Sequence, residues 1–177
     1  MQSSTQTSPL EEFLQQPDIE ESPAWEFIDR PYQKPMPTLY HSRLQRNLVD
    51  AINAATEQYE AIQELRCVIP PLSPVPDISV IAVARLPESD GPFQGAPDWM
   101  IEVRSPDQST LKLQRKILHC IENGTQLAWL IDIQKRQVWV WQGQELPTIY
   151  SSSDLLPTIG EISEWTVDVV IDLAQRR

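Results

Sequence analysis

An apolar, β-branched run directly after a proline is the feature that most constrains how this chain can fold. The run DISVIAVARL begins at Asp77, immediately after Pro76. Ile and Val in near-continuous succession are typical of a strand that is buried on both faces. A second run, DWMIEVRS at 98–105, is stopped by Pro106. Two such strands indicate a central sheet that helices must cover.

Helical periodicity is found on either side of these strands. From Thr38, apolar residues recur at four-residue steps and predict a helix with one buried face. A second helix is predicted over 108–123. The predicted order is helix, strand, strand, strand, helix, strand, strand, a mixed α/β pattern with a mixed central sheet flanked by helices. The buried face of the first helix is predicted to carry Tyr40, Leu44, Leu48 and Ile52. The other predicted elements are a short helix at 9–16, an extended segment at 24–37, and strands at 67–69, 126–133 and 136–143.

Composition indicates one acidic globular domain. The chain has 177 residues, 41% hydrophobic and 22% charged, which suits a single domain over 10–177 after a flexible N-terminus at 1–9. No run approaches the roughly 20 apolar residues that cross a bilayer. Since the first residues also lack a secretory pattern, we expect a cytoplasmic protein with no membrane partner. Cys67 and Cys120 are expected to be reduced and buried.

The net charge of −11 bears on the class of partner. Proteins that hold nucleic acid without sequence preference normally present a basic surface to the phosphates. A strongly basic protein is excluded here. A local basic patch is still possible, because 104–116 holds four basic residues against Asp107 alone.

Carboxylates stand on both central strands. Asp77 opens the first strand and Glu102 lies in the middle of the second, on the same face as Met100 and Arg104 because side chains alternate along a strand. Two carboxylates from adjacent strands can hold a hard divalent cation, and Lys116 on the following helix could stabilise developing charge. For Arg104, a phosphate clamp and a salt bridge to Glu102 or Asp107 are about equally expected. Spacing alone favours a structural role for these acids.

Longer strings carry a family resemblance. The chain contains PDWMIEVRSPDQ, then KILHCIENG and AWLID, preceded by VPDISVI and WEFIDRPYQKPMPTLYH. These strings resemble the Uma-two family of restriction endonucleases, also called domain of unknown function 820. The resemblance spans about residues 10–175. It implies the restriction-endonuclease-like core of the PD-(D/E)xK superfamily.

The resemblance also implies roles for particular residues. Asp77 and Glu102 would bind Mg²⁺ or Mn²⁺, and the lysine of the family pattern falls on Lys116. Glu26 and His41 match further family positions and are expected near the site, although a structural hydrogen bond is at least as good an explanation of His41. Two departures are Cys120 in place of a tyrosine and Arg30 in place of a glycine, so the turn at Asp29 must differ. Asp98 could simply cap the turn before its strand.

Three functions remain open from the sequence. A metal-dependent deoxyribonuclease is favoured by the set Asp77, Glu102 and Lys116. A non-enzymatic interaction or regulatory module is favoured by the charge of −11 and by the absence of an evident DNA-reading element. An acidic subunit that acts only in a complex is the third.

Tryptophans suggest an assembly. Trp129, Trp139 and Trp141 lie on adjacent predicted strands, and the last two share a face. Such residues could stack on bases, but an apolar face buried in a homodimer or higher oligomer is the more common arrangement.

Overall fold

The computed structural model describes residues 6–143 and 146–177. Its centre is a six-stranded sheet with the strand order β10-β9-β8-β7-β5-β3. The β7–β8 pair is parallel and the other neighbours are antiparallel. The strands are β3 (Tyr59–Gln63), β5 (Ile78–Ala82), β7 (Trp99–Val103), β8 (Leu127–Asp132), β9 (Gln137–Trp141) and β10 (Thr148–Ser151).

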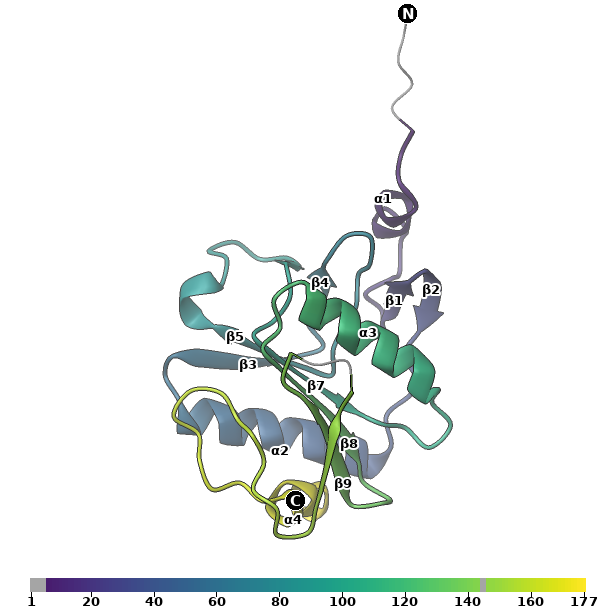
Figure 1. Cartoon of the computed structure of the whole chain (residues 1–177). Helices are drawn as coiled ribbons and strands as arrows, with labels where there is room; N and C mark the ends of the chain where they lie inside the picture. The colour runs from purple at the N-terminus through teal and green to yellow at the C-terminus, as the bar shows by residue number, and fades with distance from the viewer. Residues whose placement is uncertain (1–5, 144–145) are drawn as a thin grey trace, which may run out of the picture.

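Helices cover both faces of this sheet (Figure 1). On one face, α2 (Leu39–Ala55) and α4 (Val167–Asp172) pack against the sheet and form the larger apolar core. On the other face, α3 (Thr110–Glu122) packs against β7, β8 and β9 through the smaller core. The predicted α/β class with a mixed sheet between helices is confirmed.

Alternation along β7 fixes which layer each side chain enters. Ile101 and Val103 belong to the core beneath α2, whereas Met100 belongs to the core beneath α3. Glu102 has the same parity as Met100, so it faces α3 as the sequence predicted. The register pairs Ile78 with Ile101 and would set Asp77 opposite Glu102, which directs both carboxylates to one face.

A hairpin and a capped helix precede α2. The helix α1 (Pro9–Leu14) begins at Ser8, whose hydroxyl and backbone form a capping box with Glu11. The strands β1 (Trp25–Ile28) and β2 (Arg30–Gln33) join directly at Asp29, which has φ 73°. Whether this turn differs from that of the family stays a prediction. Of the segment 1–9 that is expected to be flexible, residues 1–5 lie outside the described residues.

Several expectations about individual segments are wrong. Tyr40 is 47% exposed, and the adjacent His41 is the buried residue in the first turn of α2. Neither β3 nor β6 (Phe93–Gln94) was predicted, and β6 pairs with β4 (Cys67–Val68). Short 3₁₀ turns follow β5 at Val83–Arg85 and α4 at Leu173–Gln175.

The tryptophans do not form an exposed face. Trp129 and Trp141 are buried in the two cores of the chain itself, and Trp139 is partly buried beside Trp141. The basis of the predicted oligomer is therefore wrong, and the oligomeric state stays a prediction. No helix in the described part of the chain is long and apolar enough to span a bilayer.

Candidate active site

Lys116 is a buried lysine held between two carboxylates. Ser109 caps α3, and one face of that helix brings Lys116 over Glu102 on β7. The Lys116 Nζ lies 2.5 Å from Glu102 Oε1 and also pairs with Glu26 Oε1 from β1. All three side chains are at most 2% exposed. A desolvated charge is tolerated only when it is paired, so this triad depends on its mutual charges.

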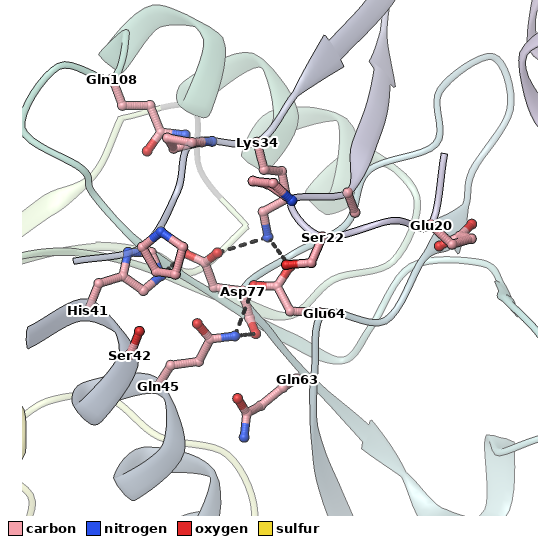
Figure 2. Close-up of a pocket in the computed structure, with 14 residues that line it drawn as sticks. Glu20, Ser22, Lys34, His41, Ser42, Gln45, Gln63, Glu64, Asp77 and Gln108 are labelled. Atoms are coloured by element: carbon pink, nitrogen blue, oxygen red, sulfur yellow. Dashed lines mark hydrogen bonds and ion pairs between the residues drawn. The ribbon is translucent and has the colours of Figure 1, made fainter. Parts of the chain in front are cut away.

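Asp77 is held by a second lysine. Its Oδ1 accepts a hydrogen bond from Lys34 Nζ at 2.9 Å, and its Oδ2 accepts one from the Val103 backbone N–H at 2.7 Å. The His41 Nε2 lies 3.5 Å from the same Oδ2. Lys34 also pairs with Glu64 Oε2 at 2.6 Å (Figure 2). The Asp77 carboxylate is thus fixed between a strand, a helix and the segment that follows β2.

One backbone carbonyl joins the two lysines. The Val75 oxygen accepts hydrogen bonds from Lys34 Nζ at 2.8 Å and from Lys116 Nζ at 3.3 Å. The Val75 N–H donates to Glu26 Oε1 at 2.8 Å. The segment before β5 therefore links the Asp77 half of the site to the Glu102 half.

Burial and neighbouring charges shift the pKa values of Glu102 and Asp77 in opposite directions. Burial, together with the negative charges of Asp77 and Glu26, raises the pKa of Glu102 against the opposing Lys116 ammonium. Burial alone would also raise the pKa of Asp77, but Lys34 and His41 outweigh it and hold that pKa well below its usual range. Two neighbouring carboxyls with pKa values pushed apart are typical of sites that perform acid–base chemistry.

The pKa values of the cationic side chains Lys116 and His41 are both raised. Burial would lower the pKa of Lys116, yet Glu102, Glu26 and Asp77 raise it above its ordinary value. Burial would likewise lower the pKa of His41, and the hydrogen bond and charge of Asp77 raise it. Lys116 is therefore a fixed positive charge near neutral pH rather than a proton acceptor.

Three further residues belong to this network but were not identified from the sequence. They are Lys34, Gln45 and Glu64. Gln45 donates from Nε2 to Glu64 Oε1 at 3.0 Å and to the Asp77 carbonyl at 2.7 Å. A usable signal existed for Gln45, because it lies four residues after His41 and therefore on the same helix face. Glu64 could not be found without the unpredicted strand β3.

Among the described residues, Arg104 makes no ion pair with the residues of this network. It pairs with Asp132 through Nη1 and Oδ2 at 3.0 Å, so the expected salt bridge to Glu102 or Asp107 is wrong. The Asp98 side chain does not cap the turn before its own strand: its Oδ2 accepts the Ala82 N–H at the end of β5 at 2.7 Å, and its Oδ1 pairs with Arg85.

Two clefts open beside the network. The first, of about 340 Å³, is lined by Lys34, Glu64 and Asp77. The second, of about 240 Å³, is lined by Arg104, Ser105 and Asp132 among others. His41 lines both clefts. The Asp77 side of the site is therefore open to a ligand, whereas the Lys116 triad is enclosed.

The donor set can be tested against the divalent ion that the resemblance implies. Within residues 6–143 and 146–177, no group of three or more His, Cys, Asp or Glu residues could hold a metal ion. Mg²⁺ commonly takes only one or two carboxylates and completes its shell with water and substrate phosphates. Glu102 Oε1 is buried and, apart from its ion pair with Lys116, accepts no hydrogen bond. Asp77 and Glu102 suit such an ion in donor type and number, and Lys34 and Lys116 hold these two carboxylates in this structure.

Comparisons with known proteins agree on one family. Residues 10–169 match the model of the Uma2 (Uma-two) family, described as "putative restriction endonuclease". A crystal structure of a "putative nuclease belonging to DUF820" from Anabaena variabilis is 37% identical and superposes with a TM-score of 0.86, covering 94% of this chain and 98% of that one. No curated protein matches the chain. With the fold, the strings and the family model in agreement, the chain belongs to the Uma2 family of restriction-endonuclease-like proteins.

Proposed function

We propose that this protein is a metal-dependent endonuclease that hydrolyses DNA phosphodiester bonds, with Asp77, Glu102 and Lys116 as catalytic residues. The observation that carries the proposal is that Lys116 of α3 pairs with Glu102 of β7 and also donates to the Val75 carbonyl, two residues before Asp77 in the segment that leads into β5. The family and the related nuclease structure support the same chemistry. DNA is the substrate that this relationship suggests.

Each residue has a chemical role in this proposal. Asp77, which keeps its charge because Lys34 and His41 lower its pKa, and Glu102 would hold Mg²⁺ or Mn²⁺. Such an ion, when bound, supplies Lewis acidity toward the phosphodiester and lowers the pKa of water. Lys116 remains positive and stabilises the charge that develops on the phosphoryl oxygens. His41 orients Asp77 through its Nε2.

Cleavage of plasmid DNA with Mg²⁺ or Mn²⁺ tests this proposal. Glu102→Gln and Asp77→Asn should each reduce the cleavage rate by roughly 10²-fold or more, because each replaces a carboxyl group proposed to hold the ion by a neutral amide. Glu57→Gln, which changes an exposed carboxylate just after α2, is the matched control and should cleave like wild type. Wild-type rates in Glu102→Gln would refute the assigned site.

A non-enzymatic interaction module is the second candidate. It is favoured by the lysines that already neutralise both central carboxylates, and by the net charge of −11. It predicts no cleavage with either metal and no heat of Mg²⁺ binding in calorimetry. Metal binding that disappears in Asp77→Asn would exclude it. A homo-oligomer is compatible with either function, and sedimentation would measure it.

A further inference from the structure

The second cleft concentrates unsatisfied polar atoms. Of five buried side-chain N or O atoms without a hydrogen-bond partner in the described residues, three belong to residues that line it: His41 Nδ1, Arg104 Nε and Ser105 Oγ. Leaving a buried polar atom unpaired is costly, so such atoms rarely gather without a ligand or water to satisfy them. Their gathering beside a solvent-open cleft points to a binding site.

Arg104 lines this cleft, and its buried Nε has no hydrogen-bond partner among the described residues. Its Nη1 is bound by Asp132, whose other carboxylate oxygen accepts the Lys135 N–H at 3.0 Å. One nitrogen therefore fixes the orientation of the guanidinium, and the Nε–Nη2 edge makes no bond to any described residue. That edge has the spacing of two oxygens of a phosphate or carboxylate, which arginine binds with two parallel hydrogen bonds.

Ser105 adds a second donor. Its side chain is buried, with 7% of the residue exposed, and its backbone N–H is already used by Gln108 Oε1 at 3.2 Å. Its hydroxyl is buried and has no hydrogen-bond partner among the described residues, so it is left as an unused donor in the wall of the cleft. The remaining walls include Pro106 and Ile133, which exclude water from a bound group and strengthen its hydrogen bonds.

The position of this cleft relates it to the candidate active site. His41 lines both clefts, and its Nε2 faces Asp77. Arg104 comes two residues after Glu102 on the same strand and its extension. A group bound in this cleft is therefore separated from Asp77 by the His41 side chain.

We propose that Arg104 and Ser105 bind a backbone phosphate of the DNA strand next to the phosphodiester that is cleaved. This inference rests on the proposed function and adds a substrate-positioning subsite to it. A phosphodiester carries one negative charge, which suits one guanidinium edge and one hydroxyl beside the paired Asp132. The contact is independent of base sequence.

Binding of a fluorescent DNA duplex to the full chain, measured by anisotropy in EDTA over a series of salt concentrations, tests the subsite without cleavage. Arg104→Gln should lower the slope of log K against log salt by about 0.9, the value for one lost phosphate contact. Arg104→Lys keeps the charge and a partner for Asp132 but loses the two parallel N–H donors of the guanidinium, so it should weaken binding about 10-fold. Ser105→Ala should weaken it about 3-fold.

Arg85→Gln is the matched control. Asp98, just before β7, is buried and pairs with Arg85, and Arg104, just after β7, pairs with Asp132 in the same way. The Arg85→Gln variant should leave the slope unchanged. Urea unfolding of each variant checks that the fold is kept. Because Arg104→Lys and Ser105→Ala leave Asp132 paired or untouched, they remain informative if Arg104→Gln unfolds.

Duplexes carrying a single neutral methylphosphonate locate the contact. One position should weaken wild-type binding and have no further effect in Arg104→Gln. The inference is overturned if every position affects both proteins equally, if the three variants bind like wild type, if the loss depends on base sequence, or if wild type binds no duplex. Failure of plasmid cleavage with the binding results intact would instead count against the proposed function alone.

Discussion

Replacing Lys116 by methionine tests whether the buried triad holds its charges by mutual pairing. Methionine has a similar length but no charge, so the carboxyls of Glu26 and Glu102 lose their shared cation. Glu102 can take up a proton readily, because burial and its acidic neighbours already raise its pKa. A second carboxyl must then be protonated as well. At pH 7, protonating a carboxyl with an ordinary glutamate pKa of about 4.3 costs about 3.7 kcal/mol, because each pH unit above the pKa corresponds to about 1.36 kcal/mol.

The expected loss of about 4 kcal/mol should depend on pH. The folded variant holds a proton that the unfolded chain releases above about pH 4.3, so its free energy of unfolding falls as the pH rises. At pH 5 the loss should shrink to about 1 kcal/mol. Urea unfolding at pH 5, 6 and 7, followed by the fluorescence of the buried Trp99 and Trp129, measures this difference.

Two variants control this experiment. Lys112→Met lies one turn earlier on α3, where the Lys112 Nζ sits 4.0 Å from the centre of the Tyr32 ring, and should cost about 1 kcal/mol or less at every pH. Glu26→Gln combined with Lys116→Met should recover most of the stability, because glutamine can still accept the Val75 N–H. A single variant as stable as wild type, or a loss that is constant from pH 5 to 7, would refute the reasoning.

Three further predictions concern stability and reactivity. The Lys34 ammonium lowers the pKa of Asp77, so that carboxylate stabilises the fold above about pH 3.9 and loses this effect as the pH falls. Asp77→Asn should therefore make the free energy of unfolding fall less steeply at acid pH. An unchanged acid dependence would contradict this. Burial raises the pKa of Cys67 to about 11 and also raises that of Cys120, so a thiol reagent at pH 8 should label both only on unfolding, and rapid native labelling would contradict it. Ser8→Ala should cost about 1 kcal/mol by removing the capping box, measured by urea unfolding; no loss would mean that α1 frays.

The strands and helices that carry Asp77, Glu102 and Lys116 could be predicted because local patterns determine them. Continuous apolar runs marked β5 and β7, and four-residue periodicity marked α2 and α3. Alternation then correctly gave the face on which Glu102 lies.

Contacts that depend on strand pairing could not be predicted. Arg104 follows β7 and Asp132 ends β8, and these strands are parallel with Val103 beside Ile131, so the pair forms through a register that local sequence does not contain. Similarly, the segment YEAIQ has polar residues that favour no element alone, and it becomes the strand β3 by pairing at the edge of the sheet with β5.

Tyr40 shows the limit of periodicity at a helix end. A four-residue step placed it on the buried face, but α2 begins only at Leu39, and its first turn extends past the apolar core. There the polar network around Asp77 takes the place of that core. His41 is buried instead, beside a carboxylate rather than among apolar side chains.

The lysines that neutralise Asp77 and Glu102 have a consequence for how sequences of this kind can diverge. Their cations come from the chain itself, so the architecture requires no bound ion to hold its acidic centre together. A relative with no hydrolytic activity could keep the same folded scaffold, provided that each carboxylate and its lysine were retained or replaced together. Selection for folding alone would then preserve these pairs, and their presence in a relative would by itself be no proof of turnover.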